Sequence, residues 1–252
     1  MSTIVTWNVN GIRARAAQVL DYLTTRQPGV LCLQEIKASA EQIPDEVTHV
    51  EGYVLGTNGA PTGYSGVAIF VRQDLAEGCA FRTPPFDFEN RALEAHLPAL
   101  ELSIVNLYCP NGGKAYEPKL TFYDGLLAFA ADRRAAGLPT WLTGDFNIAH
   151  TDRDLHPKER QKADIGVRPE ERARFSALLG HGLTDVFRRE HPDTDDQFTW
   201  WPYAPWAKKA NHGWRIDYHL VPEAVAAQVA TCEIDRTFGS SDHVPVVATR
   251  TR

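Results

Sequence analysis

The sequence contains few cysteines and no long hydrophobic segment, and both absences narrow the class of protein. The four cysteines show no C-x-x-C spacing, which argues against structural zinc and favours a reducing compartment. The apolar runs are far shorter than the roughly 20 residues that cross a bilayer. Residues 3–7 already form a strand-like run, so no secretory signal is expected. We therefore expect a cytoplasmic protein without a membrane partner.

A flexible linker, a low-complexity tract and an internal repeat are also lacking. The candidate functional residues run from Asn8 to His243, so we predict a single domain over residues 1–252. Excess positive charge is missing as well, because the formal net charge is −6. That charge argues mildly against a nucleic-acid partner. It describes the whole chain, however, and says nothing about one face.

Six short apolar runs carry polar residues at their boundaries. They lie at residues 2–8, 30–35, 102–108, 139–145 and 214–217, and the triplet 241–243 introduces the run 244–248. Runs of this length between Gly or Pro residues are typical of buried strands. Side chains at strand ends and in the loops beyond them converge on one crevice. The pattern therefore predicts one assembled active site.

Helices are expected between these runs. Apolar residues at three- and four-residue spacing predict helices over 13–26 and 118–136. A third helix over 169–179 is predicted from Pro169, a favoured first helical residue, and from Gly180 just beyond it. From residue 52 to 108, short apolar runs follow one another without a helix, which indicates antiparallel pairing and mixed sheets. We expect an α/β sandwich with a sheet at each end of the sequence and helices outside.

The sharpest local motif is Gly144-Asp145-Phe146-Asn147. In extended chain, Asp145 and Asn147 would point to one side and Phe146 into the core. Gly144 would let another group approach the backbone closely. A carboxylate beside an amide can align a water molecule and a phosphate oxygen. For the isolated motif, an Asx turn that closes a strand is the alternative.

Asn8 and Asn10 would share a face by the same alternation, with a turn before Gly11 as the alternative. Glu35 could be a solvated strand terminus or a Mg²⁺ ligand, since one or two carboxylates suffice for that ion. Asp217 and His243 suggest a His–carboxylate pair, in which the imidazole is favoured as a cation.

Residues 199–216 hold four of the six tryptophans, with Lys208, Lys209, His212 and Arg215 and no acidic residue. Aromatic side chains interleaved with cations are typical of a surface that stacks on nucleic-acid bases. About half of these tryptophans are expected in the core.

These motifs together resemble the exonuclease III family of apurinic/apyrimidinic endonucleases. The residues are TWNVNGIR at 6–13, LQEIK at 33–37, NLY at 106–108, GDFN at 144–147, GWRIDY at 213–218 and SDH at 241–243. The resemblance covers the chain from end to end, in order. The wider endonuclease/exonuclease/phosphatase superfamily shares several elements, but its DNase I-like and sphingomyelinase-like branches typically have His in place of Tyr108.

The resemblance implies a four-layered α/β sandwich, in which two mixed β-sheets pack face to face with helices on the outside. It implies a Mg²⁺ cofactor, with Mn²⁺ as a substitute, and no organic cofactor. The implied metal neighbourhood is Asn8, Glu35, Asp145, Asn147, Asp242 and His243. The implied catalytic residues are Tyr108, Asp145, Asn147, Asp217 and His243. In this scheme Asp145 orients or deprotonates the attacking water, and His243, supported by Asp217, donates to a phosphate oxygen.

For DNA, the resemblance implies contacts by Asn10, Arg13, Lys37, Lys114, Trp200, Trp206, Trp214 and Ile216. Trp200, Trp214 and Ile216 match an apolar pocket for an extruded abasic sugar. The chain also departs from some relatives, which have Asp at Asn10, Arg at Lys114 and a larger residue at Ala204. Lysine cannot grip phosphate through two parallel hydrogen bonds as arginine does.

The expected function is therefore Mg²⁺-dependent incision of DNA 5′ to abasic sites, which leaves a 3′ hydroxyl. Additional 3′→5′ exonuclease and 3′-phosphodiesterase activity are included in this expectation. The expected partner is double-stranded DNA with abasic or 3′-blocked lesions, bound by a monomer. Two rival hypotheses are a phosphoesterase for phospholipid or inositol phosphate, and a catalytically silent DNA-binding module.

Overall fold

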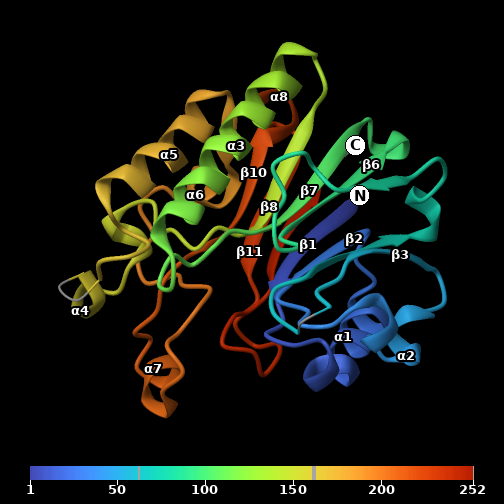
Figure 1. The fold of residues 1–252 in the computed structure, drawn as a ribbon, viewed down its shortest axis with the longest axis horizontal. Helices are drawn as coiled ribbons and strands as arrows, with labels where there is room; N and C mark the ends of the chain where they lie inside the picture. Colours follow the sequence, from blue (N-terminus) through green and yellow to red (C-terminus); the bar gives the residue numbers. More distant parts are fainter. Residues whose placement is uncertain (62, 161–162, 252) are drawn as a thin grey trace.

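The computed structural model describes residues 1–61, 63–160 and 163–251. These residues form two six-stranded sheets (Figure 1). The first sheet has the order β11-β12-β1-β2-β4-β3; its strands are β1 (Ser2–Asn8), β2 (Val30–Gln34), β3 (Tyr53–Asn58), β4 (Val67–Arg72), β11 (Val229–Ile234) and β12 (Val246–Arg250). The second has the order β5-β6-β7-β8-β10-β9; its strands are β5 (Ala80–Arg82), β6 (Ala92–Leu97), β7 (Leu102–Tyr108), β8 (Thr140–Asp145), β9 (Leu183–Asp185) and β10 (Asp217–Pro222).

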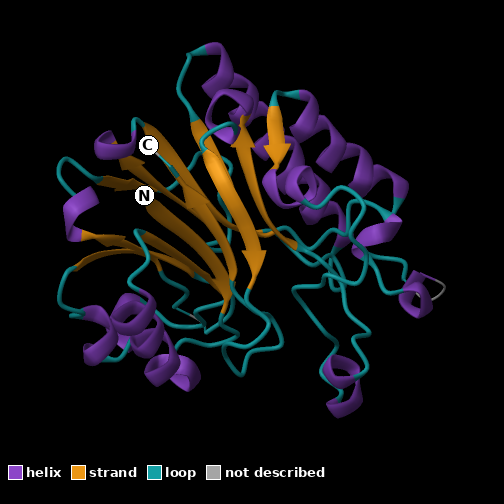
Figure 2. Ribbon diagram, turned by 180° about the vertical axis from the view of Figure 1, so that it is seen from behind, coloured by secondary structure: helices purple, strands orange, loops and turns teal. Residues whose placement is uncertain are grey.

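The helices lie outside the sheets (Figure 2). The α-helices are α1 (Ala16–Asp21), α2 (Asp45–Thr48), α3 (Tyr116–Ala135), α4 (Pro157–Arg160), α5 (Pro169–Gly180), α6 (Val186–Glu190), α7 (Pro205–Lys209) and α8 (Glu223–Ala226). Other helical segments are the 3-10 turns η1 (Arg13–Arg15), η3 (Ala40–Gln42), η4 (Gln73–Leu75), η5 (Pro98–Leu100) and η6 (Asp152–Asp154) and the π-helical segment η2 (Tyr22–Arg26). Figure 1 shows α1 and α2 on one side of the sheet pair and α3 and α5 on the other.

Strand alternation explains the four layers. In β2, Val30 and Cys32 belong to the cluster between the sheets, which also contains Ile104 and Trp141 of the second sheet. The neighbouring side chains of β2, Leu31 and Leu33, instead pack in the cluster that includes α1. Because successive side chains point to opposite faces, one strand contributes to two cores. The predicted four-layered sandwich is confirmed.

Each sheet is mixed, as predicted. β1 pairs with β2 in parallel and β7 with β8 in parallel, while the other pairings are antiparallel. The expectation of one sheet at each end of the sequence is wrong, because β1 pairs with β12. The two termini consequently lie side by side (Figure 1). Hydrophobic periodicity locates a strand but does not identify its partner.

Several element boundaries also differ from the prediction. The predicted helix over 13–26 is three consecutive helical segments, η1, α1 and η2. The apolar run 214–217 is not a strand, because β10 begins at Asp217. Trp214 makes only isolated bridges, to Leu155 and Trp200. Trp214 therefore lies in a loop beyond the sheet and not in a strand.

The strand ends gather at one edge of the sandwich. Asn8 lies opposite Gln34 in the first sheet, and Asp145 lies between Tyr108 and Asp217 in the second. The strands approach closely at Gly144, where an added Cβ would meet the carbonyl oxygen of Leu107 at 2.0 Å. Glycine is therefore required beside Asp145, as expected from the motif.

No helix in the described part of the chain is long and apolar enough to span a membrane.

Candidate active site

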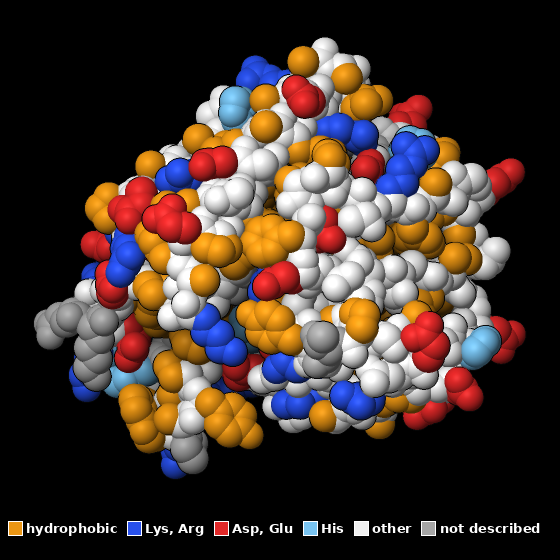
Figure 3. All heavy atoms as spheres, in the orientation of Figure 1, with side chains coloured by type: hydrophobic (Ala, Val, Ile, Leu, Met, Phe, Trp, Pro, Cys, Tyr) orange, Lys and Arg blue, Asp and Glu red, His pale blue; other side chains and the backbone are white. Residues whose placement is uncertain are grey.

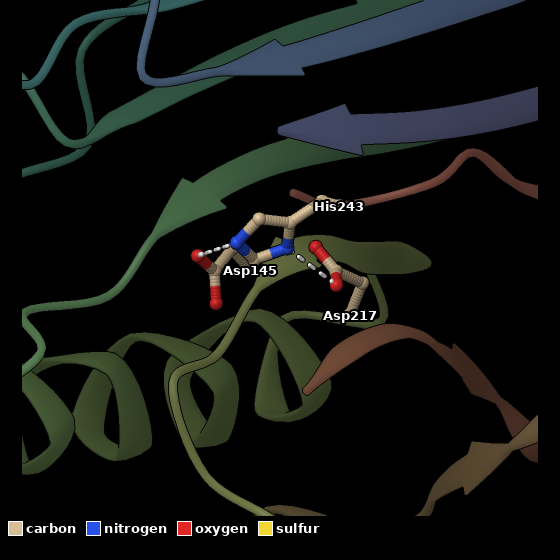
Figure 4. A group of neighbouring side chains, drawn as sticks. All are labelled: Asp145, Asp217 and His243. Atoms are coloured by element: carbon tan, nitrogen blue, oxygen red, sulfur yellow. Dashed lines mark hydrogen bonds and ion pairs between the residues drawn. The ribbon is translucent and has the colours of Figure 1, made fainter. Parts of the chain in front are cut away.

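An imidazole between two carboxylates forms the centre of the site (Figure 4). Nδ1 of His243 lies 2.9 Å from Oδ2 of Asp217, and Nε2 lies 3.8 Å from Oδ2 of Asp145. Asp145 comes from β8, Asp217 from the first residue of β10, and His243 from the loop before β12. Residues almost 100 positions apart are thus brought together by the pairing of β8 with β10 and by the packing of the two sheets.

Burial and neighbouring charges set the protonation states of this group. Burial opposes a charge on His243, but the carboxylates of Asp217 and Asp145 outweigh it and raise the histidine pKa to about 10. Burial raises the pKa of Asp145 to about 7, although His243 favours its ionised form. At neutral pH His243 is therefore a cation, and Asp145 is poised to exchange a proton.

Asn147 reaches the site through a turn and not through strand alternation. β8 ends at Asp145, and Asn147 has φ 51°. Its backbone N–H donates to Oδ1 of Asp145 at 2.9 Å, and its side-chain amide donates to the carbonyl of Cys109 at 2.9 Å. Phe146 is buried, as expected. The predicted alternation is therefore wrong, and an Asx-type turn fixes the amide beside the carboxylate.

The two asparagines predicted near the N-terminus differ in burial and in their hydrogen-bond partners. Asn8 is fully buried, and its amide donates to Oδ2 of Asp145 at 3.0 Å. Asn10 lies beyond the end of β1 with φ 46°, so the two do not share a strand face. Its amide donates to Oδ1 of Asp242 at 2.9 Å. Asp242 also accepts a hydrogen bond from the indole of Trp200 at 3.1 Å.

Glu35 is held at the same edge by two partners. The hydroxyl of Tyr108 donates to Oε1 at 2.6 Å, and Nζ of Lys37 lies 2.9 Å from Oε2. Burial disfavours the carboxylate, but these two partners together lower the pKa of Glu35 below its ordinary value. Burial and the charge of Glu35 raise the pKa of Tyr108, so its hydroxyl stays a donor. Tyr108 is thus a buried aromatic with a polar end in the site.

Most predicted site residues line one cavity of about 730 Å³. Its walls include Glu35, Lys37, Tyr108, Lys114, Asp145, Asn147, Trp200, Trp214, Ile216, Asp242 and His243. Five predicted residues lie outside the lining: Asn8, Asn10, Arg13, Trp206 and Asp217. Asn8, Asn10 and Asp217 lie behind the wall and contact residues that line it. Arg13 is exposed beside the carbonyl of Lys37.

One wall of the cavity is aromatic. Trp200 and Trp214 meet edge to face with ring centroids 5.9 Å apart, and the largely buried Ile216 packs in the same cluster. A Cβ added at Gly166 would come within 2.9 Å of Trp214, so the loop closes tightly on the indole. The wall is therefore closely packed and carries no charge.

The expected nucleic-acid surface is smaller than residues 199–216. Trp201 is fully buried, whereas Trp206 is 54% exposed on α7, which projects from the body in Figure 1. The assignment of Arg215 to this surface is wrong, because its side chain is 1% exposed and bonded to Asp154 and Asp185. Figure 3 shows basic and hydrophobic side chains beside a hollow between the α7 projection and the rest of the molecule.

Two cations that motif reasoning missed support the site. Arg91 is 2% exposed, lines the cavity and lies over the ring of Tyr108 at 4.8 Å. Lys119 is fully buried in α3, and its Nζ donates to the carbonyls of Asn111 and Asn147 at 3.1 and 2.8 Å. Its charge is balanced by Glu171 at 2.6 Å. Lys119 occupies a helix, where a lysine is ordinarily solvated, so only its place among the apolar residues of that helix could have signalled burial.

We expect K119M to lower the free energy of unfolding by about 3–5 kcal/mol, because it leaves the buried carboxylate of Glu171 without its cation. Urea denaturation of K119M and of the exposed-site control K114M would measure the difference. A loss below about 1 kcal/mol in K119M would contradict the role of this ion pair.

The donor set fits a hard divalent cation. Ligand atoms of Asp145, Asp217 and His243 lie within 4.8 Å of one another and could hold a metal ion. Both nitrogens of His243 face carboxylates, however, and a protonated imidazole has no lone pair to offer a cation. The oxygen donors of Glu35, Asp242 and Asn8 lie at the same edge and are of the type that Mg²⁺ prefers.

Residues 5–243 match the model of the Endonuclease/Exonuclease/phosphatase family. The chain belongs to this family. The Exodeoxyribonuclease of Bacillus subtilis is 30% identical over 249 residues, which are 96% of this chain and 97% of that protein. Recombination repair protein 1 of Drosophila melanogaster is 33% identical over 96% of this chain, although the match spans only 36% of that longer protein.

Solved structures of family members have the same fold. The 3′ phosphatase NExo from Neisseria, in a structure bound to product DNA hairpin, gives a TM-score of 0.88 at 32% identity, and the match covers 100% of both chains. An AP endonuclease from Archaeoglobus fulgidus gives a TM-score of 0.87 at 28% identity, with 99% of each chain covered. The resemblance inferred from the sequence motifs is confirmed, and with it the α/β sandwich.

Proposed function

We propose that this chain is a DNA phosphodiester hydrolase that incises the backbone 5′ to an abasic site and leaves a 3′ hydroxyl. The observation that carries the proposal is one cavity that Glu35, Asp145 and His243 line together with the aromatic wall of Trp200 and Trp214. Its relatives include an Exodeoxyribonuclease and an AP endonuclease. The proposed substrate is double-stranded DNA with abasic or 3′-blocked lesions, acted on with Mg²⁺, or Mn²⁺ in its place.

The chemistry divides among named side chains. Asp145, with a pKa near 7, accepts the proton of the attacking water, which Asn147 helps to align. His243, charged at neutral pH, donates to a non-bridging phosphate oxygen. Tyr108 contacts the phosphate or the leaving 3′ oxygen.

Glu35 and Asp242 would hold the metal ion, with Asn8, the third predicted ligand at this edge, buried behind the cavity wall. Bound there, it would supply Lewis-acid stabilisation of the charge that develops on the phosphate. The predicted ligand roles for Asp145 and Asn147 belong to the same proposal, whereas the predicted ligand role of His243 is not carried into it, because a protonated imidazole has no lone pair for the ion.

The aromatic wall is proposed as the specificity element. An extruded deoxyribose without a base could lie against Trp200, Trp214 and Ile216, all of which line the cavity. A nucleotide that lacks its base costs least to extrude from the duplex, because little stacking is lost. Lys114, Lys37 and Arg13 lie on or beside the rim and would contact phosphates. Trp206 on α7 would stack on DNA farther from the scissile bond.

A second candidate is removal of 3′ blocking groups, together with 3′→5′ exonuclease activity. The likeness to the 3′ phosphatase NExo favours it. A phospholipid or inositol phosphate substrate is disfavoured by the exposed Trp206 with its neighbouring lysines and by Tyr108. A silent DNA-binding module is disfavoured because the catalytic side chains are in contact with one another.

The proposal also covers the domain organisation, the cellular location, the oligomeric state and the cofactor. We propose that residues 1–252 act as one domain, which the family match over 5–243 supports. The chain is proposed to be a cytoplasmic monomer that needs no organic cofactor.

The test is a duplex oligonucleotide with one abasic analogue, incubated with the protein and Mg²⁺. We expect a single nick 5′ to the lesion and its disappearance when a chelator is added. An undamaged duplex is the matched control, and a duplex with a 3′ phosphate measures the second candidate activity. Absence of a magnesium-dependent nick at the lesion, with removal of the 3′ phosphate intact, would favour the second candidate.

A further inference from the structure

Lys37 places an ammonium group among the oxygen atoms assigned to the metal. Its Nζ lies 2.9 Å from Oε2 of Glu35 and donates to Oδ1 of Asn10 at 2.6 Å. Asn10 in turn donates to Asp242 at 2.9 Å. The ammonium of Lys37 is therefore paired with one proposed metal ligand, Glu35. It is linked to a second, Asp242, through the side-chain amide of Asn10.

The backbone on both sides of this contact has an unusual conformation. Asn10, Glu35 and Lys37 have φ values of 46°, 50° and 51°, a region that residues other than glycine seldom adopt. The strained segment is tied on two sides: Lys37 N–H donates to the carbonyl of Ser65, and Gly11 N–H donates to that of Glu35. Strain that surrounding hydrogen bonds maintain is typical of functional sites.

The side chain itself is partly exposed. The side chain of Lys37 is 36% exposed and lines the cavity, whereas that of Glu35 is 17% exposed. A lysine has a long flexible stem, so its ammonium can leave Glu35 and reach the cavity without a change in the backbone. The cavity is where the proposed function places the DNA phosphates.

We propose that Lys37 is an internal counter-ion that competes with the divalent cation for Glu35, and that its displacement couples metal binding to DNA binding. The inference rests on the proposed role of Glu35 as a metal ligand. Without metal, the ammonium neutralises the carboxylate. When a divalent cation takes that carboxylate, the ammonium loses its partner and a DNA phosphate supplies a new one. Each ligand then raises the affinity for the other, as reciprocal coupling requires.

The first test measures Mn²⁺ affinity without DNA, by electron paramagnetic resonance of free Mn²⁺. We expect K37M to bind Mn²⁺ about tenfold more tightly than the unaltered protein, because the competitor is gone. K37R keeps the charge and should stay close to the unaltered affinity. Lys114 is the matched control: it lines the same cavity, but its ammonium lies over the ring of Tyr64 and not on a proposed ligand.

K114M separates competition from a general effect of positive charge. An equal gain in K37M and K114M, no gain in K37M, or weaker binding in K37M would each overturn the proposal. Thermal melting of each variant checks that the fold is retained.

The second test measures coupling on an abasic-analogue duplex with a cleavage-resistant phosphorothioate at the scissile linkage. We expect K37M to weaken DNA binding about tenfold more with Mn²⁺ than in chelator. Equal losses in the two conditions would remove the coupling. The Mn²⁺ measurement uses no DNA, so a failure of abasic-site cleavage would leave its result interpretable.

Discussion

Replacement of His243 by alanine is expected to slow incision of abasic DNA by roughly 10²- to 10⁴-fold, the usual contribution of a positioned proton donor. The imidazole is the only cation among the described residues that contacts both Asp145 and Asp217. Its removal deprives the developing phosphate charge of a donor in a buried site. Single-turnover cleavage of the abasic duplex would measure the loss.

H243A leaves the buried carboxylates of Asp145 and Asp217 without their cation, so thermal melting must show that the variant is folded at the assay temperature. The matched control is H49A, in the helix layer over the first sheet, which should cleave at the unaltered rate. Near-normal cleavage by H243A would remove His243 from the mechanism.

The pH dependence gives a second readout of the same residue. His243 must be protonated to donate, and its pKa is raised to about 10, so activity should fall only as the pH rises through about 10. D217N removes the carboxylate on Nδ1 and should move this alkaline limb down by roughly 1–3 pH units. An unchanged alkaline limb would show that Asp217 does not set the charge of His243.

The same shift affects stability. The pKa of His243 in the folded protein lies above its unfolded value near 6.5. The contribution of His243 to the free energy of unfolding is therefore fully present below that pH. It is lost as the pH rises through about 10.

Replacement of Asp145 by asparagine is expected to lower cleavage by at least about 10²- to 10⁴-fold while DNA binding survives. The change keeps the size of the side chain and removes the proton acceptor. Its single carbonyl oxygen can accept from the amide of Asn8, but the backbone N–H of Asn147 then loses its acceptor. Because burial raises the pKa of Asp145 to about 7, activity of the unaltered protein should increase as the pH rises through that value.

Two assays separate chemistry from binding for D145N: single-turnover cleavage with Mg²⁺, and binding of the abasic duplex in chelator. The control D193N alters a carboxylate that is 92% exposed and should change neither. Cleavage by D145N at the unaltered rate would contradict the proposed base. Loss of binding together with cleavage would instead assign Asp145 to DNA recognition.

The motifs predicted the membership of the site better than its geometry. Asp145, Asn147 and His243 line one cavity, as expected from residues at strand ends. The predicted reason was wrong for Asn147, since β8 ends at Asp145 and a left-handed turn directs the amide. A short polar motif identifies the chemistry of its side chains, but turn and strand are alternatives that local sequence does not separate.

Charge patterns were less informative than motifs. Arg215 lies among tryptophans and lysines in the sequence, and so it resembles a DNA contact. In the structure it is buried between Asp154 and Asp185, residues 61 and 30 positions away. Whether a cation meets solvent or a buried carboxylate depends on distant parts of the chain, which periodicity does not describe.

The sequence by itself determined the α/β class and the family, and it predicted many of the side chains that line the cavity, because these depend on local patterns of residue type. Only the tertiary structure decided that both chain ends join one sheet, that Lys119 supports Asn147 from inside, and that Lys37 rests on Glu35. The first two contacts join residues from separate elements. The contact of Lys37 with Glu35 depends on the positive φ of both residues, which sets the direction of their side chains. Their energy comes from burial and charge neutralisation, which exist only after the sheets have packed.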